Sequence, residues 1–187
     1  MKIEVESRKP KGLKDHLALA LTTFGVGYIP GAHGTYGSAV GVLIYVLSGG
    51  VWVNASARFP AFDGRSALSF QGWTVVVVSL CIVALTLAGI WASNRSIELL
   101  GNSDPSQAVV DEVIGLLVTF LFIPFTFSWQ MILIGFLLFR LFDIWKPYPI
   151  DDLQNLKGGL GICADDIVAG VYAGVCLSVF YALSFLL

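Results

Sequence analysis

Charged side chains interrupt three segments of this chain that are otherwise apolar enough for a membrane interior. The segments are 109–115, with Asp111 and Glu112, 139–147, with Arg140, Asp143 and Lys146, and 161–170, with Asp165 and Asp166. A charge at bilayer depth costs at least a few kcal/mol, so such residues usually belong to a functional site. Carboxylates suit a hard cation such as Mg²⁺, and Arg together with Lys suits a phosphate. The simplest interpretation is metal-dependent phosphate chemistry at a membrane surface.

The composition predicts a membrane protein. Of the 187 residues, 56% are hydrophobic and only 13% are charged, whereas a soluble domain carries about 25% charged residues. Mean hydropathy is +0.80. The net charge of −2 favours neither nucleic acid nor a strongly basic membrane-binding surface.

Hydrophobic runs predict an all-α polytopic bundle of about five transmembrane helices. We expect these helices at about 38–53, 73–92, 108–127, 129–145 and 162–187. The apolar stretch at 13–29 is short for a span and starts with charged residues, which predicts an N-terminal interfacial or re-entrant helix. We expect a polar N-terminal tail at residues 1–12 and a single membrane-embedded domain at residues 13–187.

Lysine and arginine are unevenly distributed across this five-span arrangement. Of the eleven, only Arg58 and Arg65 fall on the side opposite the N-terminus. The positive-inside rule therefore places the N-terminus in the cytoplasm. The third and fifth spans start, and the fourth ends, at this same cytoplasmic face. We therefore expect the charged motifs to meet there.

The basic residues share a helix with one of the acids. Arg140, Asp143 and Lys146 are spaced i, i+3, i+6, which places them on roughly one helix face. The functional interpretation is a phosphate clamp beside a metal ligand. The alternative is an Arg140–Asp143 pair that neutralises itself, with Lys146 extending to the interface. An ion pair without a function would still carry the free-energy cost of placing charges in the membrane, which favours the clamp.

The acids of the other two motifs form adjacent pairs, Asp111-Glu112 and Asp165-Asp166. Adjacent helical residues diverge by about 100°, so the two members of a pair face different neighbours. Acids at a helix N-terminus are also favoured by the helix dipole alone. That alternative explains one pair easily, but two pairs plus Asp143 would repel one another without a cation. Mg²⁺ typically takes one or two protein carboxylates, so the five need not all be ligands.

A glycine-rich segment, Gly34-Thr35-Tyr36-Gly37-Ser38, precedes the first expected span. It could present backbone N–H groups and the hydroxyls of Thr35 and Ser38 to a phosphate at a helix N-terminus. Its glycines could equally serve turning or close packing. We expect Gly37-x-x-x-Gly41 and Gly170-x-x-x-Gly174 to be packing faces. His33 could shuttle protons, although isolated histidines are more often incidental.

At these residues the sequence resembles the phosphatidylglycerophosphatase A family over about residues 20–180. The resemblance rests on four blocks in order: Tyr28-Ile29-Pro30-Gly31-Ala32-His33-Gly34-Thr35-Tyr36-Gly37-Ser38, Val110-Asp111-Glu112-Val113-Ile114-Gly115, Phe139-Arg140-Leu141-Phe142-Asp143-Ile144-Trp145-Lys146-Pro147-Tyr148-Pro149-Ile150, and Gly158-Gly159-Leu160-Gly161-Ile162-Cys163-Ala164-Asp165-Asp166-Ile167-Val168-Ala169-Gly170. The third and fourth blocks are long and unusual. In the first block, His33 stands where the family usually carries a proline.

The resemblance implies a Mg²⁺-dependent lipid phosphatase of the bacterial inner (cytoplasmic) membrane. Its substrate would be phosphatidylglycerophosphate, and its product phosphatidylglycerol. The family's acidic and basic motif positions fall on Asp111, Glu112, Arg140, Asp143, Lys146, Asp165 and Asp166. We expect Glu112, Asp143 and Asp166 to bind the metal, and Asp111 or Asp165 to act as the catalytic base. Arg140 and Lys146, with Thr35 and Ser38, would bind the substrate phosphate.

Two other protein classes also place acids in membrane helices. A cation- or proton-coupled transporter uses intramembrane carboxylates and broken helices. However, the charges here gather at one expected face rather than at the midplane, and no inverted repeat is visible. A lipid head-group transferase also uses acidic motifs, but the expected Asp-Gly-x-x-Ala-Arg pattern is absent from the sequence.

Overall fold

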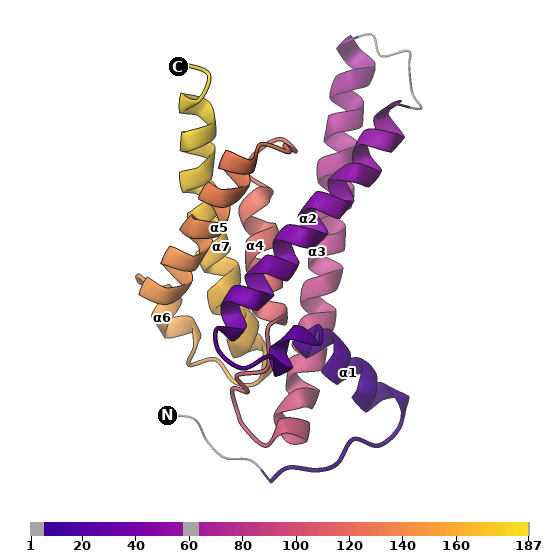
Figure 1. The fold of residues 1–187 in the computed structure, drawn as a ribbon, viewed down its shortest axis with the longest axis vertical. Helices are drawn as coiled ribbons and strands as arrows, with labels where there is room; N and C mark the ends of the chain where they lie inside the picture. The colour runs from indigo at the N-terminus through magenta and orange to yellow at the C-terminus, as the bar shows by residue number, and fades with distance from the viewer. Residues whose placement is uncertain (1–5, 58–63, 187) are drawn as a thin grey trace.

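The computed structural model describes residues 6–57 and 64–186, without the side chains of 55–57 and 64–71. Its helices are α1 (Leu13–Thr23), the 3₁₀ turn η1 (Val26–Tyr28), α2 (His33–Ala57), α3 (Gly64–Leu100), α4 (Val110–Phe120), α5 (Trp129–Trp145), α6 (Ile150–Leu153) and α7 (Gly159–Leu183) (Figure 1). No strand occurs in these ranges. The all-α prediction is therefore confirmed.

Three helices are long and apolar enough to cross a membrane, by length and composition. They lie at His33–Asn54, Gly72–Leu100 and Gly159–Leu183, within α2, α3 and α7. The helix α4 has 11 residues and α5 has 17. At 1.5 Å per residue these helices are about 17 and 26 Å long, shorter than a hydrocarbon core of about 30 Å. The expected count of about five spans therefore remains a prediction.

The expected third span, 108–127, is helical only over α4. Pro124 has no N–H to donate to a continuing helix. Two hydrogen bonds with Tyr45 instead hold the chain after α4. The Thr126 N–H donates to the Tyr45 hydroxyl at 3.0 Å, and that hydroxyl donates to the Thr126 carbonyl at 3.2 Å. The loop thus folds back against α2 rather than extending the helix.

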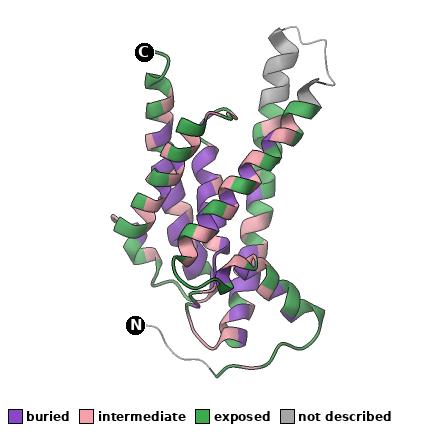
Figure 2. Cartoon of the chain, in the orientation of Figure 1, coloured by how far each residue is buried: buried purple, intermediate pink, exposed green. Residues whose placement is uncertain are grey.

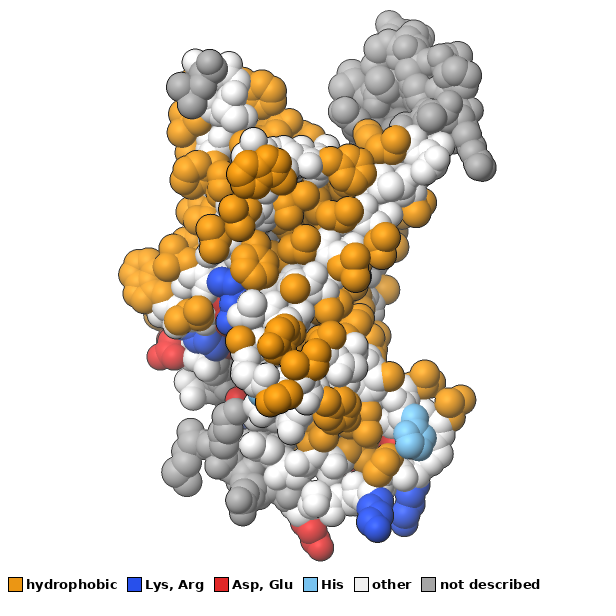
Figure 3. All heavy atoms as spheres, in the orientation of Figure 1, with side chains coloured by type: hydrophobic (Ala, Val, Ile, Leu, Met, Phe, Trp, Pro, Cys, Tyr) orange, Lys and Arg blue, Asp and Glu red, His pale blue; other side chains and the backbone are white. Residues whose placement is uncertain are grey.

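The core of the bundle surrounds α4, which is mostly buried, whereas α3 is largely exposed along its apolar length (Figure 2). Leu116 and Phe120 of α4 pack with Phe139 of α5 and Leu177 of α7 in the main apolar cluster. Figure 3 shows apolar side chains over the upper part of one face and charged ones in its middle and lower parts. Apolar residues at the surface of α3, such as Leu80, suit contact with lipid rather than water.

Close contacts at glycines set the spacing of α4 and α7. A Cβ added at Gly170 would lie 2.3 Å from the Gly115 carbonyl oxygen, and one at Gly115 would lie 2.5 Å from the Asp166 carbonyl oxygen. A Cβ at Gly174 would lie 2.3 Å from Phe122. The expected packing role of Gly170 and Gly174 is confirmed. This contact brings the first turns of α4 and the acids of α7 together.

Candidate active site

A pocket of about 770 Å³ lies where α4 and α7 begin and α5 ends. The charged motif residues that line it are Asp111, Glu112, Asp143, Lys146, Asp165 and Asp166. The starts of α4 and α7 and the end of α5 lie toward the same end of the bundle (Figure 1). The prediction that the charged motifs converge is therefore confirmed.

Three of the carboxylates have the geometry of a metal site. One oxygen from each of Asp111, Glu112 and Asp166 lies within 4.8 Å of the others. The Oδ1 atom of Asp111 and the Oε2 atom of Glu112 are buried without a hydrogen-bond partner among the described residues. A set of oxygen donors alone suits a hard divalent cation such as Mg²⁺. Because like charges this close repel, a cation there would satisfy both the charge and the unpaired oxygens.

The structure divides the acids differently from the expected roles. Asp111, for which we expected a role as base, joins Glu112 and Asp166 in this group. Asp143, which we expected as a ligand, instead accepts a hydrogen bond from Arg140, with 2.6 Å between Nη1 and Oδ2. Both side chains of this pair are largely buried, at 19% and 13% exposed. The individual roles of these acids stay predictions.

The guanidinium of Arg140 lies against the start of α2. A Cβ added at Gly34 would lie 2.6 Å from Arg140 Nη1 and 2.8 Å from Glu112 Oε1. A larger residue at this position would displace the end of one of these two side chains. Arg140 is not among the residues that line the pocket, but it lies beside Glu112, which is. It is therefore close to the acidic group while already paired with Asp143.

Lys146 connects the end of α5 to α7. It is the C-cap of α5 in the left-handed conformation, with φ of 49°, and its N–H donates to the Phe142 carbonyl. Its Nζ donates to Asp165 Oδ2 at 2.7 Å, while Asp165 Oδ1 is buried without a partner among the described residues. Burial alone would lower the pKa of the Lys146 ammonium, but the hydrogen bond to Asp165 and the nearby carboxylates raise it. Lys146 therefore stays charged at neutral pH.

Thr35 and Ser38 do not line the pocket, although the neighbouring His33 and Gly34 do. Ser38 is fully buried, and its hydroxyl donates to the Gly34 carbonyl at 2.8 Å within α2. Thr35 is exposed. The structure thus does not bring these two hydroxyls to the acids, and their role in phosphate binding stays a prediction.

One wall of the pocket is the connection between α3 and α4, which contributes Ser103 to Ser106 and Ala108. The α1–η1 unit supports this connection through two backbone contacts. The Val109 N–H donates to the Thr22 carbonyl at 2.9 Å. A Cβ added at Gly27 would lie 2.0 Å from the Gln107 carbonyl oxygen. These contacts hold the residue that precedes α4, whose first residue, Val110, lies one position before Asp111.

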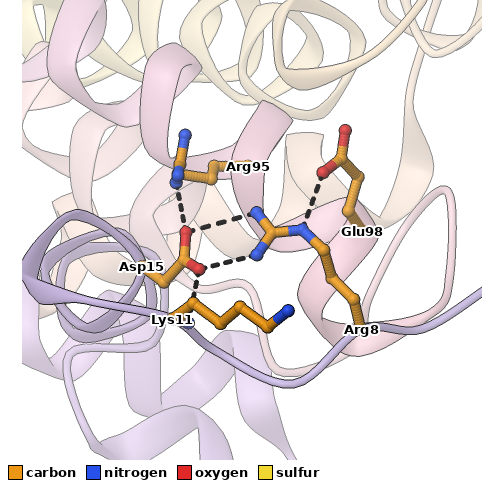
Figure 4. Close-up of polar contacts among 5 residues, drawn as sticks. All are labelled: Arg8, Lys11, Asp15, Arg95 and Glu98. Carbon is orange, nitrogen blue, oxygen red and sulfur yellow. Dashed lines mark hydrogen bonds and ion pairs between the residues drawn. The ribbon is translucent and has the colours of Figure 1, made fainter.

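An ion cluster around the buried Asp15 attaches α1 to the end of α3 (Figure 4). Asp15 is fully buried and accepts hydrogen bonds from Arg8 Nη1 at 2.6 Å, from the Lys11 N–H at 2.7 Å, and from Arg95 Nε. Arg8 also pairs with Glu98 at 3.1 Å. Chiefly because of the hydrogen bond from Arg8, the pKa of Asp15 is well below its usual range. The predicted polar tail thus contributes Arg8 and Lys11 to the contacts of the bundle.

This cluster was not predicted from the sequence, although Asp15, like the other acids, is a charged residue within an apolar stretch. Asp15 lies in an apolar helix, as Asp111 and Asp165 do. Its main partner on α3, Arg95, is 80 positions away, so no spacing rule connects the two residues. The available signal was the cost of a charge within an apolar stretch.

The protein is a helical bundle with three helices that are apolar enough to cross a membrane. At one end of the bundle lies an acidic pocket in which three carboxylates are close enough to bind one metal ion. A sequence model of the phosphatidylglycerophosphatase A family matches residues 19–181. The chain therefore belongs to the phosphatidylglycerophosphatase A family, as the motif resemblance predicted. The charged blocks that carry the resemblance are the ones that line the pocket.

Relatives of this chain extend over most of its length. A Bacteroides thetaiotaomicron protein with the provisional name phosphatidylinositol-3-phosphatase is 36% identical over 159 residues, which cover 84% of this chain and 89% of the relative. Phosphatidylglycerophosphatase A of Escherichia coli is 33% identical over 79% of this chain and 73% of its own. Phosphatidylglycerophosphatase A of Haemophilus influenzae is 32% identical over 88% of each chain. No solved structure matches the chain.

Proposed function

We propose that this protein is a Mg²⁺-dependent phosphatase that hydrolyses the terminal phosphate monoester of phosphatidylglycerophosphate to give phosphatidylglycerol. The observation that carries the proposal is the group formed by Asp111, Glu112 and Asp166, with unpaired buried oxygens, inside a pocket that also holds Lys146. Family membership supports the same chemistry. No observation on the described residues favours the transporter alternative.

Each charged residue has a proposed part in the reaction. When bound at Asp111, Glu112 and Asp166, Mg²⁺ would supply Lewis-acid stabilisation of the phosphate oxygens and lower the pKa of a bound water. Asp165, through its unpaired Oδ1 atom, would accept a proton from the attacking water. Lys146 would orient Asp165 and direct its remaining N–H donors toward the phosphate. Water and the phosphate monoester would give the lipid alcohol and inorganic phosphate.

Arg140 would stabilise negative charge on the transferring phosphate. Its Nη1 atom is used by Asp143, but a guanidinium has five N–H donors in a fixed fork, so others remain available. Asp143 would hold this fork in place rather than bind the metal directly. In this assignment Asp143 acts through its ion pair with Arg140 and is not a metal ligand.

Membrane insertion and orientation are also part of the proposal. The three apolar helices support insertion into a bacterial inner membrane, and the excess of lysine and arginine on the N-terminal side supports a cytoplasmic pocket. A cysteine introduced at Lys157 should react with an impermeant reagent from the cytoplasmic side, and one at Asn54 from the opposite side. Reaction of both from one side would contradict this orientation. Asp63, on the same expected loop as Asn54, lies outside the described residues.

The test of function is phosphate release by the purified protein in mixed micelles. We expect rapid release from phosphatidylglycerophosphate. The 36% identical relative is named for a different lipid monoester, so phosphatidylinositol 3-phosphate is the comparison substrate. A higher kcat/KM for the inositol lipid would contradict the proposed substrate, and no release from either lipid would contradict the phosphatase itself.

A further inference from the structure

The pocket extends well beyond the acidic group. Its outer part is formed by the connection between α3 and α4, with Ser106, and by the connection between α6 and α7, with Gln154, Asn155 and Lys157. None of these outer residues belongs to the charged motifs. Asp104 of the α3–α4 connection and Asp151 of α6 also line the pocket. The pocket therefore combines an acidic inner end with an outer part of mixed charge, to which Lys157 contributes the basic group.

Its volume is too large for a single phosphate. Pockets of roughly 300–1,000 Å³ enclose whole organic ligands, and this one measures about 770 Å³. The lipids named for two relatives, phosphatidylglycerophosphate and phosphatidylinositol 3-phosphate, share one layout. In each, a polyol separates the phosphate monoester from the phosphodiester that leads to the acyl chains. A pocket for such a head group must receive two phosphates.

The two lysines that line the pocket differ in their pairing. Lys146 is already engaged with Asp165 at 2.7 Å. Lys157 is exposed and makes no ion pair or side-chain hydrogen bond in the part of the chain that the structure describes. The amide of Gln154 is also occupied, since it donates to Asp151 Oδ1 at 2.8 Å. The ammonium of Lys157 is therefore available to an incoming anion.

Position also separates Lys157 from the acidic group. The helix α7 begins at Gly159, and Asp165 follows six residues later. At 1.5 Å per residue this is about 9 Å along the helix axis. The flexible stem of Lys157 can cover part of that distance, which leaves room for a polyol between an anion at Lys157 and a phosphate at the acids. Without the positive charge of Lys157, the carboxylates of this pocket would repel a second phosphate at its outer end.

We propose that Lys157, assisted by the Asn155 amide, binds the phosphodiester of the lipid head group and so selects substrates that carry both phosphates. This inference rests on the proposed phosphatase function. Lys157 is then a specificity-determining residue: it contributes to substrate and product binding while the motif residues carry out hydrolysis. Its loss should affect KM rather than kcat.

The experiment compares full-length Lys157→Ala and Lys157→Arg variants with the wild type in mixed micelles. Lys14→Ala is the matched control, because it removes an exposed ammonium outside the pocket. We expect Lys157→Ala to raise KM for phosphatidylglycerophosphate by about tenfold, the effect of losing one charge-assisted contact, with kcat little changed. Lys157→Arg should retain most of the affinity, and Lys14→Ala should match the wild type.

Two inhibitors identify which phosphate Lys157 contacts. Phosphatidylglycerol retains only the phosphodiester, and inorganic phosphate resembles only the released monoester. Lys157→Ala should weaken inhibition by phosphatidylglycerol and leave inhibition by inorganic phosphate unchanged. Unchanged KM and unchanged inhibition by phosphatidylglycerol in an active variant would overturn the inference, as would a loss confined to inorganic phosphate. Failure of the wild type to release phosphate would instead overturn the proposed function.

Discussion

Arg140 and Asp143 form an ion pair one turn apart on α5, with 2.6 Å between Nη1 and Oδ2. The same guanidinium lies so close to the start of α2 that a Cβ at Gly34 would clash with it at 2.6 Å. The pair is therefore enclosed between two helices beside Glu112. Arg140 therefore contributes to the contact between α2 and α5, and its proposed action on a substrate phosphate is a separate role.

Replacement of Arg140 by lysine separates these two roles. A phosphate clamp depends on the planar fork, which lysine cannot reproduce. We expect Arg140→Lys to lower kcat/KM by about tenfold or more, equivalent to about 1.4 kcal/mol of transition-state stabilisation. The melting temperature in detergent should change little, because the charge opposite Asp143 is kept.

A purely structural pair would give a different pattern. Arg140→Lys would then keep most of the activity, and Arg140→Ala would unfold the protein by leaving Asp143 buried and unpaired. Kinetics and melting curves of both variants decide between the patterns. An active Arg140→Lys protein combined with an unfolded Arg140→Ala protein would exclude the clamp.

The convergence of the acids could be predicted from the sequence, but their grouping could not. The number of helices and their directions determine which helix ends meet at one end of the bundle. Hydrophobic runs in the sequence indicate the number and the directions. Whether Asp111 or Asp143 joins Glu112 depends on the rotation of each helix about its axis. That rotation follows from contacts such as Gly115 against Gly170, which depend on the three-dimensional packing.

Local hydrogen bonding explains why one predicted phosphate ligand lies away from the pocket. In sequence, Ser38 reads as a hydroxyl near a helix N-terminus. In the structure α2 already begins at His33, so Ser38 lies inside the helix and donates to the Gly34 carbonyl. Serine within a helix commonly bonds back to the preceding turn in this way. Because α2 starts a few residues earlier than predicted, Ser38 lies inside the helix, and its role in phosphate binding stays a prediction.

Metal dependence should follow the three grouped carboxylates. We expect EDTA to abolish phosphate release and Mg²⁺ to restore it. Glu112→Gln should lower kcat by about a hundredfold, equivalent to about 2.7 kcal/mol, and should raise the Mg²⁺ concentration that gives half-maximal rate. Asp152→Asn is the control, because Asp152 is exposed and does not line the pocket. Full activity in chelator would exclude a metal mechanism.

The contact between α4 and α7 should tolerate no side chain at Gly170. Because the clash would be with the Gly115 backbone at 2.3 Å, rotamer changes cannot relieve it. We expect Gly170→Ala to destabilise the protein by about 1–3 kcal/mol and to lower turnover by moving the acids apart. Gly50→Ala is the matched control in another helix, since nothing lies within 4 Å of its added Cβ. Equal melting temperatures for the two variants would contradict this packing.

The buried Asp15 cluster should make stability depend on pH. Because folding lowers the pKa of Asp15, its ionised form stabilises the fold at pH values above the unfolded pKa of about 3.9. That contribution declines as pH falls below about 4, toward the lowered pKa. We expect Asp15→Asn to melt well below the wild type at pH 7, and the difference to narrow by pH 3. Asp152→Asn, which changes an exposed acid, should track the wild type. If the difference in melting temperature between the wild type and Asp15→Asn stays constant between pH 7 and pH 3, Asp15 acts through packing and not through its charge.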